Sequence, residues 1–356
     1  MSNQVTLIDP ESDPRWDRFV ENHPLGWVCH LSGWKRALES CFPQMKGYYL
    51  ALSDGTGGAI KAAMPLFEVR SWLIGKRLVS IPFASVCDPL ISTSDDFAML
   101  FDAAIELSHK LGISRVEIRT YKTLPLIQDS RLGRSGLYKI HNLSLEQGPD
   151  QLWKNFHRSC IKQKISRAIK NGLILRKVEG HAYLQAFYRL YVMTRQRLCL
   201  PPQPYEFIKS IWATFSKTNH ISALLAVKDG NPVSGLMFFK FNDRVSAEFG
   251  VSDQVYWDLN PNHYLFWEAI NSACREGYKI FDFGRTSPSN QDLMEFKNRW
   301  GAAEADLVEF HYPPQIRCEV GAREHSTPYR LMRHLCQHVS EPMFERLGGF
   351  CYRHLG

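Results

Sequence analysis

The sequence contains no run of about 18 apolar residues without a charge, so it predicts no membrane-spanning helix. It has no CxxC pair and no HExxH motif, and its nine cysteines and 13 histidines are scattered, so it predicts no metal site. The first residues, MSNQVTLIDPESD, are polar and acidic and do not have the basic and then apolar order of a secretory signal. We therefore expect a cytoplasmic protein whose cysteines are free thiols.

Neither charge nor low complexity dominates the composition. Of the 356 residues, 44% are hydrophobic and 22% are charged, which is ordinary for a globular protein and excludes a disordered, collagen-like or coiled-coil chain. At about 150 residues per domain, this length predicts two domains, each large enough for a core of its own.

The positive charge is concentrated in one segment. The formal net charge is +7, and residues 151–180 hold eight cations and one anion, so the rest of the chain sums to zero. This segment predicts a local anion-binding surface, although a solvated helix face is the commoner reason for a run of charge. Its apolar stripe changes side near Cys160, which predicts a bend in the helix at that point.

The second half of the chain repeats the order of the first. In each half, the patterns predict several antiparallel strands, then a helix, then a returning strand. We therefore expect an α+β fold of two related domains, 1–148 and 149–315, followed by a helical tail, 316–356. Chance similarity between amphipathic elements is the alternative. A shift of 165 residues places Phe101 on Phe266, Gly112 on Gly277 and Glu117 on Asp282, and one residue of slip then places Arg119-Thr120 on Arg285-Thr286.

The strongest local pattern runs from Phe281 to Ala302, FDFGRTSPSNQDLMEFKNRWGA. Polar and charged residues here follow directly on a strand that we expect to be buried, and catalytic groups are often mounted in this way. The motifs DFGR and FKxxWGA resemble the FemAB-like branch of the acyl-CoA N-acyltransferase (GNAT-like) superfamily. This branch includes the Fem aminoacyltransferases, which add amino acids to peptidoglycan precursors. The resemblance covers roughly residues 34–312.

The resemblance implies two tandem GNAT-like domains that share a cleft, and an acyltransferase activity. It implies no permanently bound cofactor, but an acyl donor as co-substrate: aminoacyl-tRNA, as in Fem enzymes, acyl-CoA or acyl carrier protein. CoA-dependent GNAT enzymes have an [RQ]xxGx[GA] loop before a helix, and the corresponding segment here, Leu259-Asn260-Pro261-Asn262, lacks it. We therefore expect an ester-linked or carrier-bound donor rather than acetyl-CoA.

Three residues are candidates for catalysis. Lys297 matches the lysine of the Fem Phe-Lys motif, so the resemblance implies that it stabilises the tetrahedral oxyanion of acyl transfer. Asp282 is expected to orient or deprotonate the acceptor amine, and Glu248, on the neighbouring strand, is a second candidate base. The alternatives are a solvated lysine, an ion pair between Asp282 and Arg285, and an exposed strand carboxylate.

Further residues are candidates for binding the phosphate groups or the substrate. Lys162, Lys164 and Arg167 belong to the basic segment. Arg197 ends the next helix, and Fem enzymes use arginine on a sugar-nucleotide pyrophosphate. Asn262 opens a helix whose N-terminus attracts anions. The full set is Arg285, Lys162, Lys164, Arg167, Arg197 and Asn262.

The sequence thus predicts an N-acyltransferase that moves an aminoacyl or acyl group to the amine of a cell-envelope or polysaccharide precursor. The expected partners are the acyl donor, tRNA among the candidates, and the amine-bearing precursor. The helical tail either packs on the body or rests on the inner face of the membrane. Two alternatives stay open: fatty-acyl or short-acyl transfer from CoA or acyl carrier protein to an amino lipid or amino sugar, and a non-catalytic nucleic-acid-binding module.

Overall fold

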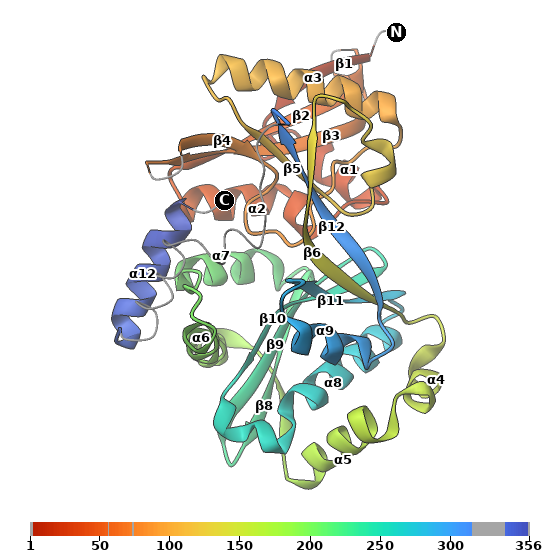
Figure 1. Cartoon of the computed structure of the whole chain (residues 1–356), viewed down its shortest axis with the longest axis vertical. Helices are drawn as coiled ribbons and strands as arrows, with labels where there is room; N and C mark the ends of the chain where they lie inside the picture. Colours follow the sequence, from red (N-terminus) through yellow and green to blue (C-terminus); the bar gives the residue numbers. More distant parts are fainter. Residues whose placement is uncertain (1–2, 56, 73–74, 315–338, 355–356) are drawn as a thin grey trace. The chain divides into compact units, whose positions relative to one another are not determined.

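The computed structural model describes residues 3–55, 57–72, 75–314 and 339–354 (Figure 1). The chain divides into two compact units. The first consists of Met1–Tyr138, Asp306–Arg323 and Phe350–Gly356, and the second of Lys139–Ala305 and Glu324–Gly349.

In the first unit, the strands lie in the order β1-β2-β3-β4-β5-β12. β4 and β5 are parallel, and the other neighbouring strands are antiparallel. The elements are β1 (Asn3–Ile8), α1 (Arg15–Asn22), α2 (Ser32–Cys41), β2 (Met45–Asp54), β3 (Ile60–Ser71), β4 (Gly75–Val79), α3 (Ser94–Lys110), β5 (Val116–Thr120) and β12 (Ala303–Tyr312).

Helix α3 supplies much of the core of the first unit. Its apolar residues recur at helical spacing, and Phe97, Phe101 and Ala104 are buried against the strands. The side chain of Thr93 accepts a hydrogen bond from the backbone N–H of Asp96, which fixes the start of the helix. The helix predicted in the first half, after the antiparallel strands and before the returning strand, is thus confirmed as α3.

In the second unit, the strands lie in the order β6-β11-β10-β9-β8-β7. β10 and β11 are parallel, and the other neighbouring strands are antiparallel. The elements are β6 (Gly133–Ser144), α4 (Gly148–Asn155), the π-helix η3 (Arg158–Lys162), α5 (Gln163–Lys170), β7 (Ile174–Lys177), α6 (Gly180–Arg197), α7 (Tyr205–Phe215), β8 (Ile221–Lys228), β9 (Asn231–Phe241), β10 (Arg244–Ser252), the 3-10 helix η4 (Gln254–Leu259), α8 (Pro261–Arg275), β11 (Ile280–Thr286) and α9 (Gln291–Asn298).

The basic segment is not one helix. The chain leaves α4 after Asn155, and the ring of His157 accepts the backbone N–H of Cys160 to start η3, which leads into α5. The predicted bend is therefore confirmed. The apolar residues Ile165 and Ala168 of α5 are buried in the same core as α8, and this packing leaves the cations of α5 on its outer side.

The bounds of the two units differ from those expected from the sequence. The reason is that most of β12, late in the chain, belongs to the first unit, and the end of β6 belongs to the second. Residues 306–312 of β12 belong to the first unit, where Val308 pairs with Thr120 of β5. Residues 139–144 of β6 belong to the second unit, where Asn142 pairs with Asp282 of β11. The boundaries 1–148 and 149–315 therefore describe the repeat in the sequence, and as domain boundaries they remain a prediction. Of the expected tail, residues 316–338 lie outside the described residues, and α12 (Glu341–His354) is its described helix.

The internal repeat reappears as a repeated buried ion pair. In the first unit, Glu117 of β5 lies opposite Val79 of β4, and Arg77, two residues before Val79, pairs with Glu117. In the second unit, Asp282 of β11 lies opposite Ser246 of β10, and Arg244, two residues earlier, pairs with Asp282. Arginine and acid thus occupy equivalent positions on equivalent parallel strands.

The one-residue slip in the repeat has a structural cause. β5 pairs with β12 without interruption from Val116 to Thr120. The pairing of β11 with β6 shifts between Asp282 and Arg285, because β11 has one residue more than its partner there. This is a β-bulge, a feature that locally bends a strand and redirects its side chains.

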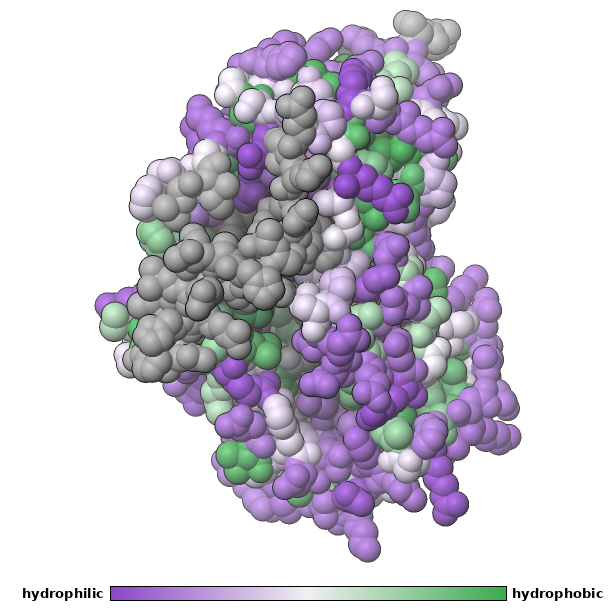
Figure 2. Space-filling view, viewed as in Figure 1, coloured by the Kyte–Doolittle hydropathy of each residue, from purple (hydrophilic) through white to green (hydrophobic). Residues whose placement is uncertain are grey.

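Hydrophilic residues cover most of the face shown in Figure 2, and hydrophobic residues form small separate groups on it. Within the described ranges, no helix has the length and apolar character needed to cross a membrane. This result agrees with the absence of a long apolar run in the sequence.

The buried pair of the first unit gives a stability prediction. Glu117→Gln leaves the Arg77 guanidinium, whose side chain is 6% exposed, without its counter-charge. We expect a loss of about 3–5 kcal/mol in the free energy of unfolding, measured by urea denaturation. The double variant Arg77→Met/Glu117→Leu should recover most of that loss. Asp54→Asn, which breaks the exposed pair with Lys61, is the matched control and should cost less than about 1 kcal/mol. A Glu117→Gln loss no larger than that of the control would contradict the structural role of the pair.

Candidate active site

The parallel strands β10 and β11 pair over only three residues and then separate. Arg244, Val245 and Ser246 pair with Ile280, Phe281 and Asp282, and no further pairs follow. Beyond this point each strand has a bulge against its other neighbour: β10 at Glu248 against β9, and β11 after Asp282 against β6. The two parallel strands therefore splay apart beyond Ser246 and Asp282.

Gly284 occupies the bulge of β11. Its φ of 74° lies in the left-handed region, and a Cβ atom at this position would stand 2.5 Å from the carbonyl oxygen of Ala247 on β10. Both conditions require glycine, since side chains are disfavoured at this φ and no space exists for one. The glycine therefore lets β11 pass close to β10 just where the two strands separate.

Asp282 is fully buried and all its hydrogen bonds lie within the strands. Its Oδ1 accepts the backbone N–H of Gly284 at 2.8 Å, and its Oδ2 accepts from Ser246 Oγ at 3.2 Å and from the Arg244 guanidinium. The ion pair that we considered as an alternative role for Asp282 exists, but its partner is Arg244. Arg285 is exposed. The side chain of Asp282 thus braces the start of the splay.

Glu248 and Asp282 are linked through one hydroxyl group. Ser246 Oγ lies 2.9 Å from Glu248 Oε1 and 3.2 Å from Asp282 Oδ2, so a single proton serves two carboxylates. Glu248 is the extra residue of the β10 bulge and is half-buried. Of the two acids, Glu248 is therefore the one with access to an approaching group.

Lys297 is a buried cation, which excludes the alternative of a solvated helix lysine. Its side chain comes from α9 and is 3% exposed, and Nζ donates to the carbonyl oxygen of Gly284 at 2.6 Å. Burial lowers the pKa of Lys297 to about 8, against the opposing effect of the negative charges of Asp282 and Glu248. A buried ammonium on the carbonyl of a strand bulge is unusual in a structural core and typical of a site that handles charge.

Neighbouring aromatic rings fix the position of α9. Phe296 packs at 5.5 Å from Phe266 and 6.2 Å from Trp300, measured between ring centroids. The side chain of Asn290 accepts the backbone N–H of Leu293 and caps the helix. Phe296 thus packs against the core, and this packing directs the next residue, Lys297, to the bulge.

His141 is a residue of this site that the sequence did not reveal. It lies on β6 opposite the β11 bulge and is fully buried, and neither ring nitrogen has a hydrogen-bond partner among the described residues. Burial lowers its pKa, and the positive charge of Lys297 adds to that shift, while Glu304 and Asp282 oppose it. A lone histidine in a strand of mixed polarity gives no sequence signal. Its place beside Lys297 comes only from strand pairing.

The basic residues do not all point to one ligand. Lys162 Nζ donates to the backbone carbonyl of Lys154 at 2.7 Å, which ties it to its own segment. Arg167 is exposed on α5. Lys164 lies near His263 at the start of α8: burial lowers the pKa of His263 to about 4, and the charges of Lys164 and Arg299 add to that shift. Lys164 and Arg167 therefore stay available to an anion.

Arg197 also lies near the start of α8. Its guanidinium stacks 4.4 Å above the ring of Trp257 in η4, the segment that leads into α8, and its buried Nε has no hydrogen-bond partner among the described residues. Asn262 is in the first turn of α8, and its Oδ1 accepts from Ser234 Oγ at 2.7 Å. Arg195, in contrast, donates twice to the carbonyl of Pro201 and supports the loop.

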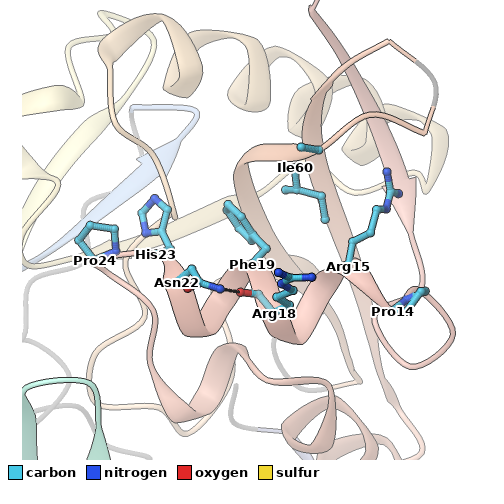
Figure 3. A pocket seen from close by; sticks show the side chains of 9 residues that line it. Pro14, Arg15, Arg18, Phe19, Asn22, His23, Pro24 and Ile60 are labelled. Carbon is cyan, nitrogen blue, oxygen red and sulfur yellow. Dashed lines mark hydrogen bonds between the residues drawn. The ribbon is translucent and has the colours of Figure 1, made fainter.

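One pocket of about 610 Å³ belongs to the first unit and contains none of the predicted site residues (Figure 3). Arg15 and Arg18 of α1 lie on its rim, and Phe19 and Ile60 form apolar walls. Arg15 is already paired with Asp13, so we assign no chemistry to this pocket.

Residues 155–298, which contain Lys297, Asp282 and Glu248, match the family model described as an acetyltransferase (GNAT) domain. The part of the chain that holds the candidate site is thus a GNAT-type acyltransferase domain. A comparison with curated proteins finds no match.

Solved structures show the same fold over most of this acyltransferase. FemX is 14% identical, with 94% of this chain and 100% of that chain covered and a TM-score of 0.70. L-PGS from Bacillus licheniformis is 13% identical, with 92% and 97% covered and a TM-score of 0.58. A tandem GNAT protein from the clavulanic acid biosynthesis pathway is 11% identical, with 89% and 100% covered and a TM-score of 0.56. The expected tandem GNAT-like α+β fold is confirmed, and the fold shared with FemX agrees with the resemblance stated from the motifs.

The buried lysine of this acyltransferase gives a pH-dependent stability. The pKa of Lys297 is about 8 in the folded chain and 10.5 ordinarily, so the unfolded chain binds more protons between these values. The free energy of unfolding should therefore rise with pH in this window. Relative to Lys297→Met, which lacks the group, the wild type should gain about 3 kcal/mol from pH 8 to pH 10.5, measured by urea denaturation. Parallel stability profiles for the two proteins would show that Lys297 has an ordinary pKa.

Proposed function

We propose that this acyltransferase moves an aminoacyl or other acyl group from an activated donor to the amine of a cell-envelope or polysaccharide precursor. The observation that carries the proposal is the buried Lys297 ammonium on the carbonyl of Gly284, at the splay of a GNAT domain. The acyl carbonyl of the donor would lie in the gap between β10 and β11. There, Lys297 can shift one N–H from the carbonyl of Gly284 to the oxygen of the reacting acyl group.

The reaction needs a cation only after the amine attacks. Attack of the amine nitrogen on the acyl carbonyl forms a carbon–nitrogen bond and puts a negative charge on the carbonyl oxygen. A fixed cation close to that oxygen stabilises the tetrahedral intermediate more than the ground state. Lys297 fits this role because its burial removes the competing water and its ammonium is already positioned by a hydrogen bond.

The attacking amine must also lose a proton. Glu248 is half-buried and shares the Ser246 hydroxyl, so its carboxylate can accept this proton at the edge of the gap. Asp282 orients Ser246 and Gly284 by accepting hydrogen bonds from the Ser246 hydroxyl and the Gly284 N–H, and it stays paired with Arg244. The intermediate then collapses, the bond from the acyl carbon to the donor breaks, and the leaving group takes up the proton from Glu248.

The start of α8 favours a donor other than acetyl-CoA. Pro261 is the first residue of the helix and has no N–H, and Asn260 before it has a left-handed φ of 57° and makes no side-chain cap. This end of the helix therefore offers fewer backbone donors to a pyrophosphate than a glycine-rich loop would. The resemblance of the DFGR and FKxxWGA motifs to Fem enzymes supports an aminoacyl donor such as aminoacyl-tRNA, and FemX and L-PGS share the fold of this chain. Binding of acetyl-CoA in the micromolar range, about −8 kcal/mol, would instead support transfer from CoA.

The catalytic role of Lys297 predicts a large and specific loss of turnover. Lys297→Met keeps the approximate length of the side chain and removes its charge. We expect kcat to fall about a hundredfold to a thousandfold, with little change in KM, in an assay that pairs aminoacyl-tRNA or acyl-CoA donors with amine-bearing envelope precursors. Lys279→Met, which changes an exposed lysine before β11, is the matched control and should keep the wild-type rate.

The pH profile separates this role from a structural one. Lys297 stabilises an oxyanion only when it is protonated, so wild-type kcat/KM should fall as pH rises through about 8. That limb should be absent from the residual activity of Lys297→Met. Wild-type turnover by the variant, or an unchanged limb, would rule out the oxyanion role and move the search to Glu248 and Asp282.

The cations beside α8 give a separate prediction about donor capture. The triple variant Lys162→Gln/Lys164→Gln/Arg167→Gln should weaken binding of unacylated tRNA and reduce the slope of log Kd against log salt by about two to three. A matched triple variant of exposed cations on α6, on α7 and in the turn after α7, Arg189→Gln/Lys209→Gln/Lys217→Gln, removes the same charge. If both triple variants lose binding equally, net charge rather than a local site holds the anion.

A further inference from the structure

The second unit has a cavity whose wall contains none of the residues proposed for acyl transfer. Its volume is about 680 Å³, within the range of cavities that bind small molecules. Its wall is formed by β7, α7, β8, β9 and the C-terminal half of α8. The residues that the argument uses are Lys177, Trp212, Lys240, Glu268, Asn271 and Arg275.

One side of this cavity is rigid. Lys240 Nζ bonds Glu276 Oε2 at 2.6 Å and lies 5.6 Å from the ring centroid of Phe238. The other carboxylate oxygen of Glu276 accepts from Ser272 Oγ at 2.7 Å. These groups are satisfied by each other, so they define the shape of the cavity and do not call for a ligand.

Other polar groups of the wall have no protein partner. Glu268 is half-buried, and burial raises the pKa of its carboxyl against the opposing charge of Arg275. Neither its carboxylate, the carboxamide of Asn271 nor the indole N–H of Trp212 makes a hydrogen bond to any described residue. A carboxylate accepts, an indole N–H donates and a carboxamide does both. A ligand for this cavity must therefore offer donors as well as acceptors.

The charges of the wall cancel. Three cations, Lys177, Lys240 and Arg275, stand against three anions, Glu179, Glu268 and Glu276. A phosphate would meet the carboxylates, and an ammonium would meet the guanidinium and the two lysines, so neither is favoured. The wall also presents the half-buried indole ring of Trp212, which suits the flat apolar side of a ligand.

We propose that this cavity is a saccharide-binding site. A neutral sugar ring carries hydroxyl groups that both donate and accept, and a C–H side that packs on an aromatic ring. It satisfies Glu268, Asn271 and Trp212 together without adding a charge. Sugar binding here does not depend on the catalytic role of Lys297. Its use, to hold the sugar part of an acceptor or of a neighbouring polymer during acyl transfer, rests on the proposed function.

Saturation-transfer NMR with the full chain tests the proposal. The probes are glucose, galactose, mannose, N-acetylglucosamine, cellobiose and chitobiose, with inorganic phosphate and a lysine-rich peptide as charged comparisons. At least one sugar should bind with a Kd of about 1 mM or tighter. Trp212→Ala and Asn271→Ala should each weaken that binding at least about tenfold, roughly 1.4 kcal/mol. Lys297→Met should bind the sugar as the wild type does, which separates this site from the proposed function.

Trp72→Ala changes a tryptophan outside the cavity that is 75% exposed, and it is the control for loss of an indole ring. Circular dichroism establishes that each variant is folded, and Asn271→Ala replaces Trp212→Ala if the latter is not. Three results would overturn the proposal: no binding of any sugar at about 10 mM, equal binding by the wild type and both cavity variants, or tighter binding of phosphate or the peptide than of every sugar.

Discussion

The short parallel contact between β10 and β11 is the constraint on which the site depends. It lasts for three residue pairs and ends at Ser246 and Asp282, and the buried Arg244–Asp282 ion pair holds it at that point. Past it, each strand follows its other neighbour and takes up one extra residue. The bulge of β11 needs Gly284, and the carbonyl of Gly284 is what Lys297 binds. Loss of the contact would therefore remove the gap, the bulge and the position of the cation together.

The first unit has the same pair of parallel strands with a buried ion pair, but without the bulge. Its Arg77–Glu117 pair occupies the equivalent positions, but β5 runs on without an extra residue. As a result, Arg119 stays inside, with its guanidinium 3.6 Å from Glu309, whereas Arg285 of the second unit is exposed. The segment after β4 also binds the end of β5: Asp88 Oδ1 accepts hydrogen bonds from the backbone N–H groups of Tyr121, Lys122 and Thr123. One inserted glycine thus separates a structural copy of this strand pair from the copy that carries the candidate active site.

Much of the local structure could be predicted from the sequence, because it depends on neighbours along the chain. The periodic helices, the bend near Cys160 and the slip of the repeat before Arg285 all have a local cause. Lys297 was found through a motif resemblance, and its role in acyl transfer stays a prediction. The exchange of β6 and β12 was not predictable, since it depends on pairing between distant segments. The partner of Asp282 and the position of His141 beside Lys297 depend on the same long-range register.

The central claim is that the β11 bulge holds a buried ammonium whose pKa is shifted toward neutrality. A heteronuclear NMR titration of lysine-labelled protein measures this directly, with the spectrum of Lys297→Met identifying the signal, and it needs no substrate. The account predicts that Lys297 titrates with a midpoint of about 8. A midpoint at the ordinary value of about 10.4 would contradict it, because an ammonium that keeps its ordinary pKa is solvated and has no special position in the site.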